Sequence, residues 1–234
     1  MRGIDGRNSE DRTLVDHILS EEEVVRLGAI LYLFALIIFF LLGTLSPARM
    51  EHLAMPYFCG LSISFLYTGG LGLKYIALGD IIFVVVFGSA SVLFAYVSQT
   101  GRFNWEPIFY AVPLALNTEA ILHSNNTRDM ESDRRAGIVT LAILIGRIAS
   151  HILYALLLFT PYIMFVVTAA RCRSINFLLP LLTIKTAFNI ERQFRNPDLT
   201  QNVPRKTTKL NLFFGFLYII ALLLTDMSRL PFIL

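Results

Sequence analysis

Charged residues and cysteines are both scarce in this sequence. Asp, Glu, Lys and Arg make up 16% of its 234 residues, the mean hydropathy is +0.62, and several long apolar runs contain almost no charge. A chain of this composition is too apolar for a soluble domain, so most of its surface should face lipid. The two cysteines, Cys59 and Cys172, lie in or beside apolar runs, which argues against a disulfide framework and against a cysteine-based metal site.

A continuous basic tract and a signal peptide are also missing. The net charge is +3, and the basic residues are spread over the segments between the apolar runs, which disfavours nucleic-acid binding. Residues 1–23 are polar and rich in acidic residues, without the apolar stretch of a signal peptide. We therefore interpret residues 1–23 as a cytoplasmic, water-facing loop, in which Ser20 and the three glutamates after it predict the start of a helix.

Apolar segments long enough to be membrane spans are abundant, by contrast. Ser46-Pro47 ends the first, the glycine-rich segment 69–72 ends the second, and Gly146-Arg147 divides the fifth from a short apolar piece at 137–145. These features predict an all-α, polytopic bundle of transmembrane helices. The expected spans are about 24–45, 53–68, 78–100, 107–123, 148–170, 175–189 and 210–224.

The loops on the two sides of this predicted bundle differ in their content of basic residues. Most Arg and Lys residues fall on the side of the amino terminus, and this bias places the amino terminus in the cytoplasm. A seven-helix receptor, whose amino terminus lies outside the cell, is disfavoured for the same reason. Asn125-Asn126-Thr127 matches the glycosylation sequon, but in a cytoplasmic loop we expect it to stay unmodified.

The segment between the fourth and fifth predicted spans concentrates charge. Asn125, Asp129 and Asp133 recur every four residues, so in a helix their side chains project from one face, one turn apart. Two carboxylates and an amide oxygen in this arrangement can hold Mg²⁺, which completes its shell with water and with the phosphate oxygens of a substrate. The alternative is a solvated loop of Asp and Arg residues that only closes the two helices.

Polar residues inside the fourth predicted span form a line toward Asn125. They are Asn117, Glu119 and His123, and the last two are four residues apart, close enough to pair in a helix. Polar side chains in membrane spans are costly, so they tend to face a cavity or a partner. Two interpretations stay open: the line borders a cavity, or Glu119 and His123 pair with each other and stabilise helix packing.

Tyr67, Lys74 and Asp80 flank the glycine-rich break after the second predicted span. Small residues let a ligand approach the backbone, and a lysine there can offset the charge of a bound diphosphate. A lysine at a membrane boundary can equally be an anchor whose ammonium group reaches the interface.

The acidic segment and its surroundings resemble a known protein family. Asn125, Asp129 and Asp133, with Arg128 before the first aspartate, resemble the second aspartate-rich motif of the UbiA superfamily of intramembrane prenyltransferases. More narrowly, residues 118–146 resemble the animal branch of this family. Segments 67–74 and 79–80 are similar to a cytoplasmic loop region of the same family, and the similarity extends over nearly the whole chain.

This resemblance implies a fold of nine transmembrane helices around a central cavity, of which the present chain would carry about seven. It also implies that Mg²⁺ ions hold the diphosphate of an isoprenyl donor, that the allylic carbon–oxygen bond breaks, and that the carbocation alkylates an aromatic ring. For the animal branch of the family, the expected reaction transfers a geranylgeranyl group from its diphosphate to menadiol and so makes menaquinone (vitamin K2).

The resemblance further implies a location and a set of partners. The expected membrane is that of the endoplasmic reticulum or the Golgi, with the mitochondrial membrane as the alternative. The expected partners are the isoprenyl diphosphate, the aromatic quinone acceptor, the lipid membrane and a membrane-protein partner, and no nucleic acid.

Roles carry over to individual residues of this chain. The expected metal ligands are Asn125, Asp129, Asp133 and Asp5. The expected catalytic residues are Asp129, Asp133, Lys74 and Tyr67. The expected substrate contacts are Asn125, Arg128, Asp80 and Glu119.

A departure from the family's pattern lies at the first residues. The family's first motif has an asparagine, an aspartate four residues later and a further aspartate, whereas Gly3-Ile4-Asp5 resembles only the end of that motif. We therefore expect residues 1–234 to be a single prenyltransferase domain that lacks the first two helices of the family fold, with little or no activity of this chain alone. The alternative function is a non-catalytic membrane protein that binds an isoprenoid or a partner protein.

Overall fold

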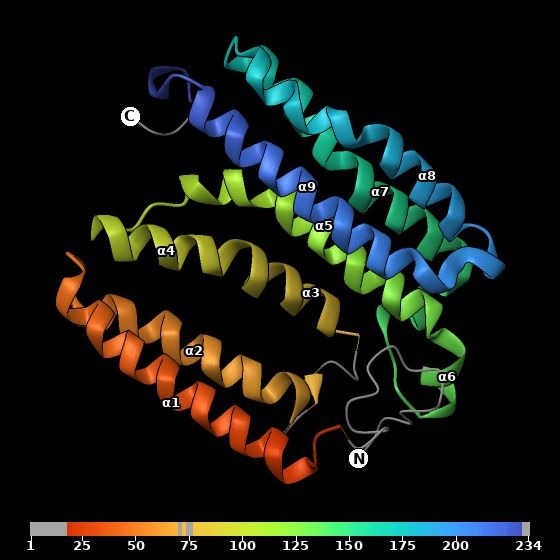
Figure 1. Cartoon of the computed structure of the whole chain (residues 1–234), viewed down its shortest axis with the longest axis horizontal. Coiled ribbons are helices and arrows are strands. Elements are labelled where there is room, and N and C mark those ends of the chain that lie inside the picture. Colours follow the sequence, from red (N-terminus) through yellow and green to blue (C-terminus); the bar gives the residue numbers. More distant parts are fainter. Residues whose placement is uncertain (1–17, 70–71, 74–76, 231–234) are drawn as a thin grey trace.

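All the regular structure among the described residues is helical. The computed structural model describes residues 18–69, 72–73 and 77–230, and Figure 1 shows them as a bundle of long helices. The first half contains α1 (Glu21–Leu45), α2 (Met50–Thr68), α3 (Gly79–Phe83), the π-helix η2 (Val84–Ala90) and α4 (Ser91–Thr100). The second half contains α5 (Glu106–Arg128), α6 (Met130–Arg135), α7 (Leu141–Arg171), η3 (Ile175–Thr183), α8 (Ile184–Phe194), η4 (Pro197–Asn202), α9 (Val203–Leu224) and η5 (Met227–Arg229).

The all-α membrane fold predicted from the sequence is confirmed. Each predicted span falls within a long helical segment, because α3, η2 and α4 follow one another without a break, as do η3 with α8 and η4 with α9. Four of these segments are long and apolar enough to cross a membrane: α1, the α3–α4 run, α7 and the η4–α9 run. Seven crossings, and the description of the chain as one domain, stay predictions.

Local chemistry sets the helix ends where the sequence predicted them. The Ser20 hydroxyl accepts a hydrogen bond from the Glu23 N–H, and the Glu23 carboxylate accepts one from the Ser20 N–H, so a complete capping box begins α1. Helix α7 changes direction at Gly146, whose φ of 77° and ψ of 169° are readily adopted only by glycine. The predicted division at Gly146 is therefore observed as a kink.

Helix α5 occupies the middle of the bundle. It packs against η2 on one side and against α7 and α9 on the other, and the α1–α2 pair lies farther out beyond α4 (Figure 1). Only Phe39 is buried among the α1 residues, where its ring stacks on Tyr57 of α2 with centroids 4.2 Å apart. The remaining apolar surface of α1 is exposed, as expected of a helix that faces lipid.

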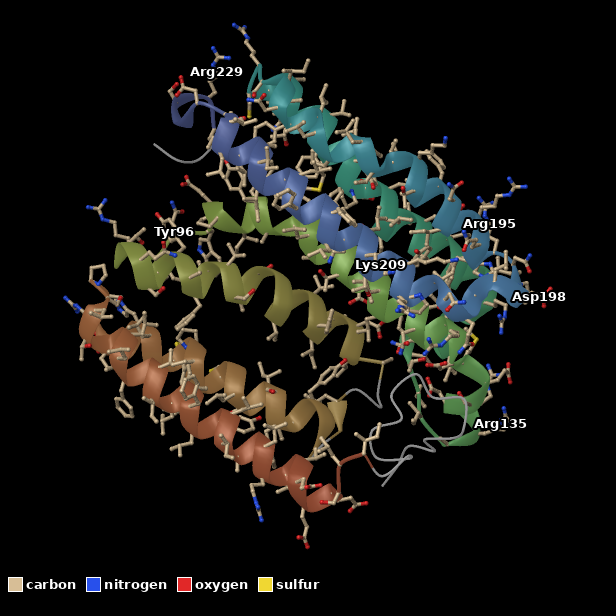
Figure 2. The ribbon with its side chains drawn as sticks, in the orientation of Figure 1. Tyr96, Arg135, Arg195, Asp198, Lys209 and Arg229 are labelled. Atoms are coloured by element: carbon tan, nitrogen blue, oxygen red, sulfur yellow. The ribbon has the colours of Figure 1, made fainter. Side chains whose placement is uncertain are left out.

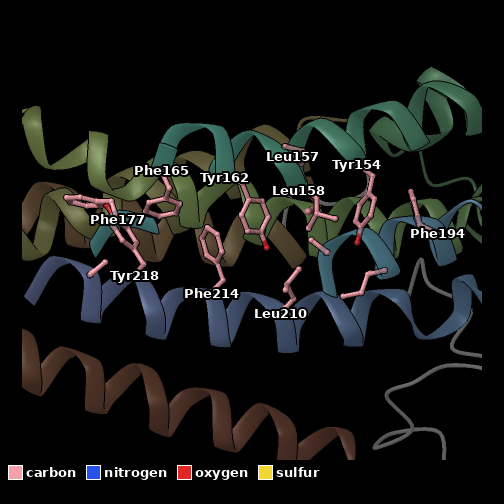
Figure 3. Packing of buried hydrophobic residues seen from close by; sticks show 14 of the residues in the cluster. Tyr154, Leu157, Leu158, Tyr162, Phe165, Phe177, Phe194, Leu210, Phe214 and Tyr218 are labelled. Carbon is pink, nitrogen blue, oxygen red and sulfur yellow. The ribbon is translucent and has the colours of Figure 1, made fainter. Parts of the chain in front are cut away.

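The main hydrophobic core lies between α7, α9 and η3. Figure 3 shows aromatic residues of α7 pointing toward α9, with Phe214 between the two helices. The Tyr154 and Thr207 hydroxyl oxygens are 2.7 Å apart, so the buried hydroxyl of Tyr154 has a hydrogen-bond partner. This half of the molecule forms the rigid platform on which α5 and its polar residues are held.

The contact between η2 and α5 depends on the absence of a side chain at Gly88. A Cβ atom at this buried position would lie 2.4 Å from the Cβ of Ala115, whereas a Cβ at Gly60 of α2 would meet nothing within 4 Å. We expect Gly88→Ala to destabilise the protein by about 1–3 kcal/mol because the two helices must separate. Thermal unfolding in detergent should show a lower Tm for Gly88→Ala and an unchanged or higher Tm for the matched Gly60→Ala control. Equal melting temperatures for both variants would contradict this account of the contact.

Candidate functional site

The acidic ladder predicted from the sequence lies where α5 ends and α6 begins. The Asp129 N–H donates to the Asn125 carbonyl at 3.0 Å, and the Asp133 N–H donates to the Asp129 carbonyl at 2.9 Å. These bonds give the three residues the spacing of successive helical turns. The predicted one-turn spacing of Asn125, Asp129 and Asp133 is therefore observed.

The side-chain oxygens of Asn125 and Asp129 converge on one guanidinium group. Nε and Nη2 of Arg128 donate to Oδ1 and Oδ2 of Asp129, both at 2.7 Å, and Nη2 also donates to Oδ1 of Asn125 at 2.6 Å. Three oxygens thus surround a positive charge, which is the donor arrangement that a hard cation uses. The side chain of Arg128 is 11% exposed and that of Asp129 is 34% exposed, so the pair lies partly away from water.

Asp133 is half-buried beside this group. Burial, and then the negative charge of Asp129, raise the pKa of Asp133 to about 6, and Arg128 opposes part of that rise. Two carboxylates that repel each other in a partly dry place are stabilised by a divalent cation. The residues therefore fit Mg²⁺, with Asn125, Asp129 and Asp133 as the ligands available to it.

A second polar cluster lies deeper in the bundle, where α3, α5 and α7 meet. Its members are Asp80, Glu119 and His123, which are 4%, 4% and 0% exposed, and one side-chain nitrogen or oxygen of each lies within 4.8 Å of the others. Nδ1 of His123 is 3.7 Å from Oδ1 of Asp80, and Nε2 of His123 is 3.2 Å from the carbonyl oxygen of Ser150. Tyr67 at the end of α2 is half-buried and within electrostatic range of both carboxylates.

A comparison of the chain with models of known families matches residues 2–225 to the UbiA prenyltransferase family. The chain belongs to this family. A UbiA prenyltransferase domain-containing protein 1 homolog from Drosophila melanogaster is 62% identical over 221 residues, which are 94% of this chain and 61% of that protein. The human and zebrafish (Danio rerio) proteins named UbiA prenyltransferase domain-containing protein 1 are 55% and 54% identical, over 98% of this chain and 68% of their own length.

Within this UbiA-family chain, the structure divides the predicted site residues into two groups. Asn125, Arg128, Asp129 and Asp133 form the ladder at the end of α5, and Tyr67, Asp80 and Glu119 lie around the buried cluster. Lys74 and Asp5, which the resemblance assigned to diphosphate and metal binding, lie outside the described residues. The roles of both groups stay predictions.

Sequence reasoning missed two connections in the UbiA site. It left open whether Glu119 and His123 pair within α5 or border a cavity, and it did not expect Asp80 on α3 to supply the atom that faces His123 Nδ1. It also assigned Arg128 to the substrate without expecting it to bridge Asn125 and Asp129. An arginine immediately before the first ladder aspartate was the available signal for the second connection.

Charged side chains lie at both ends of the bundle. Figure 2 shows Arg135, Arg195 and Asp198 at one end and Tyr96 and Arg229 at the other. Arg135 on α6 follows the ladder in the sequence, so the half-buried ladder lies at the first of these ends. Which side of the membrane this end faces stays a prediction.

Proposed function

We propose that this chain transfers a geranylgeranyl group from its diphosphate to menadiol, in the biosynthesis of menaquinone. Membership of the UbiA prenyltransferase family supports prenyl transfer, and the resemblance of residues 118–146 to the animal branch of the family supports this donor and acceptor. The single structural observation that supports the proposal most is the convergence of Asn125 and Asp129 oxygens on one positive charge.

The ladder residues bind and orient the diphosphate end of the donor. Asn125, Asp129 and Asp133 would hold Mg²⁺, which when bound supplies positive charge to the diphosphate leaving group. Arg128 lies beside the same oxygens, so its guanidinium can turn from Asp129 toward a phosphate oxygen when a metal ion takes its place. Lys74 and Asp5 complete this set in the proposal.

The chemistry then needs a dry environment. The bond between the allylic carbon and the diphosphate oxygen breaks, and its electron pair leaves with the diphosphate. A ring carbon of menadiol supplies the electrons of the new carbon–carbon bond, and that carbon loses its proton to the released diphosphate, which restores aromaticity. The apolar, aromatic-rich bundle around α5 excludes the water that would otherwise react with the carbocation.

The location of the reaction follows from the same proposal. We place the ladder and the amino terminus on the cytoplasmic side of the endoplasmic reticulum or Golgi membrane, with the mitochondrial membrane as the alternative. The uneven distribution of Arg and Lys between the loops supports this orientation.

Reconstitution with a panel of donors tests the function. The chain in lipid nanodiscs is incubated with Mg²⁺, menadiol and either geranylgeranyl or farnesyl diphosphate, and prenylated product is quantified by mass spectrometry. We expect product with the geranylgeranyl donor and at least about 10-fold less with the shorter donor. Product from farnesyl diphosphate alone would contradict the donor assignment. Tight binding of a geranylgeranyl compound without any product would instead support the second candidate, a non-catalytic isoprenoid-binding membrane protein.

A further inference from the structure

The buried cluster of Asp80, Glu119 and His123 contains more hydrogen-bond acceptors than hydrogen-bond donors. Within the described part of the chain, Oδ1 of Asp80, Oε2 of Glu119 and Nδ1 of His123 have no hydrogen-bond partner. All three side chains are at least nine-tenths buried. Two carboxylates in such a place must either share a proton or hold a cation, because two unneutralised buried charges are strongly unfavourable.

The hydrogen bond to Ser150 decides which ring nitrogen of His123 faces the carboxylates as an acceptor. A carbonyl oxygen can only accept, so Nε2 of His123 carries the proton that it donates to Ser150, at 3.2 Å. In the neutral ring Nδ1 then presents its lone pair to Oδ1 of Asp80, 3.7 Å away. A histidine whose second nitrogen donates to a backbone carbonyl is held in the way that metal-binding histidines are held.

The separations in the cluster suit a metal ion after a small adjustment. The three potential ligand atoms lie within 4.8 Å of one another. Ligands at bond lengths of about 2.0–2.2 Å in a tetrahedral shell are about 3.4 Å apart, so side-chain rotation alone could close the remaining distance. An imidazole nitrogen and carboxylate oxygens are ligand types that Zn²⁺ binds, and imidazole favours transition metals over Mg²⁺ and Ca²⁺.

We propose that Asp80, Glu119 and His123 form a second cation site, separate from the aspartate ladder, that takes a divalent transition metal such as Zn²⁺ or Mn²⁺. The metal neutralises the two buried carboxylates and joins the start of α3 to the middle of α5. Ser150 on α7 orients the histidine. None of its metal ligands belongs to the ladder, so the two cation sites can be tested separately, although Asp80 and Glu119 are also expected substrate contacts.

Cobalt substitution provides the test. Protein purified in detergent is stripped with a chelator and titrated with Co²⁺, whose visible absorption reports a nitrogen- and oxygen-ligated site, and then with Zn²⁺ while Tm is followed. We expect one Co²⁺ with visible bands, displacement by Zn²⁺ and a higher Tm with the metal. His123→Ala and the near-isosteric Asp80→Asn should each weaken Co²⁺ binding by at least about 100-fold.

Two control variants separate this site from the ladder and from the surface. Glu131 on α6 is exposed, so Glu131→Gln should leave the Co²⁺ spectrum unchanged, and Asp129→Asn should also leave it unchanged. If His123→Ala does not fold, the Co²⁺ affinity of Asp80→Asn tests the proposal, because asparagine keeps the size of the original side chain. Absence of bands and of any Tm change in the parent protein would overturn the proposal and leave a shared proton between the carboxylates. Bands lost only in Asp129→Asn would also overturn it.

Discussion

Replacing Asp129 by asparagine is expected to lower Mg²⁺-dependent prenyl transfer by about 100- to 1,000-fold. Both carboxylate oxygens of Asp129 already engage a positive group, since Arg128 donates to each of them at 2.7 Å. The amide keeps the size of the side chain but removes the negative charge, so the proposed cation and its bound diphosphate would lose one of their two ladder carboxylates. We expect Asp129→Asn to have both a lower rate at saturating donor concentration and a weaker affinity for the donor.

Two measurements separate this effect from misfolding and from low turnover. Calorimetry of geranylgeranyl diphosphate binding, with and without Mg²⁺, should show Mg²⁺-dependent affinity in the parent chain and little of it in Asp129→Asn. Glu131→Gln is the matched control, because Glu131 lies two residues away, its side chain is 65% exposed, and its carboxylate pairs with Arg134 rather than with the ladder. Retained Mg²⁺ dependence in Asp129→Asn would remove the ladder from the proposed site.

Structural features that neighbouring residues set could be predicted from the sequence. The end of α1 at Leu45, the break after Thr68 and the kink at Gly146 depend on residues within one or two positions. Proline, glycine and capping chemistry act at that range, so these features could be predicted. The ladder could be predicted for the same reason, because its spacing is that of one helical turn.

The buried cluster required information that spacing cannot carry. Asp80 reaches His123 from another helix, and the Ser150 carbonyl lies 27 residues from His123 in the sequence. Within α5 the four-residue spacing of Glu119 and His123 suggested a pair, and the third member came from the packing of α3 against α5. Helix packing selects partners through whole surfaces, so no local pattern identifies them.

Phe214→Ala is expected to destabilise the protein by about 3 kcal/mol. Phe214 is 0% exposed, and its ring packs edge-on against Tyr162 and Phe165 of α7 with centroids 5.4 and 5.3 Å away. Removing the ring leaves a cavity between α7 and α9 that neighbouring side chains can fill only in part. The lower end of the usual range applies because helix association in lipid depends on packing rather than on transfer from water.

Phe216 supplies the matched comparison, since it lies two residues further along α9 and is 62% exposed. Unfolding by heat in detergent, followed by circular dichroism, should show a Tm lower by roughly 6–12 °C for Phe214→Ala and within about 2 °C of the parent for Phe216→Ala. Because α9 and α7 together hold α5, Phe214→Ala should lose prenyl-transfer activity at a lower temperature than the parent chain. Equal stability of the two variants would mean that the packing of Phe214 between α7 and α9 does not support the fold.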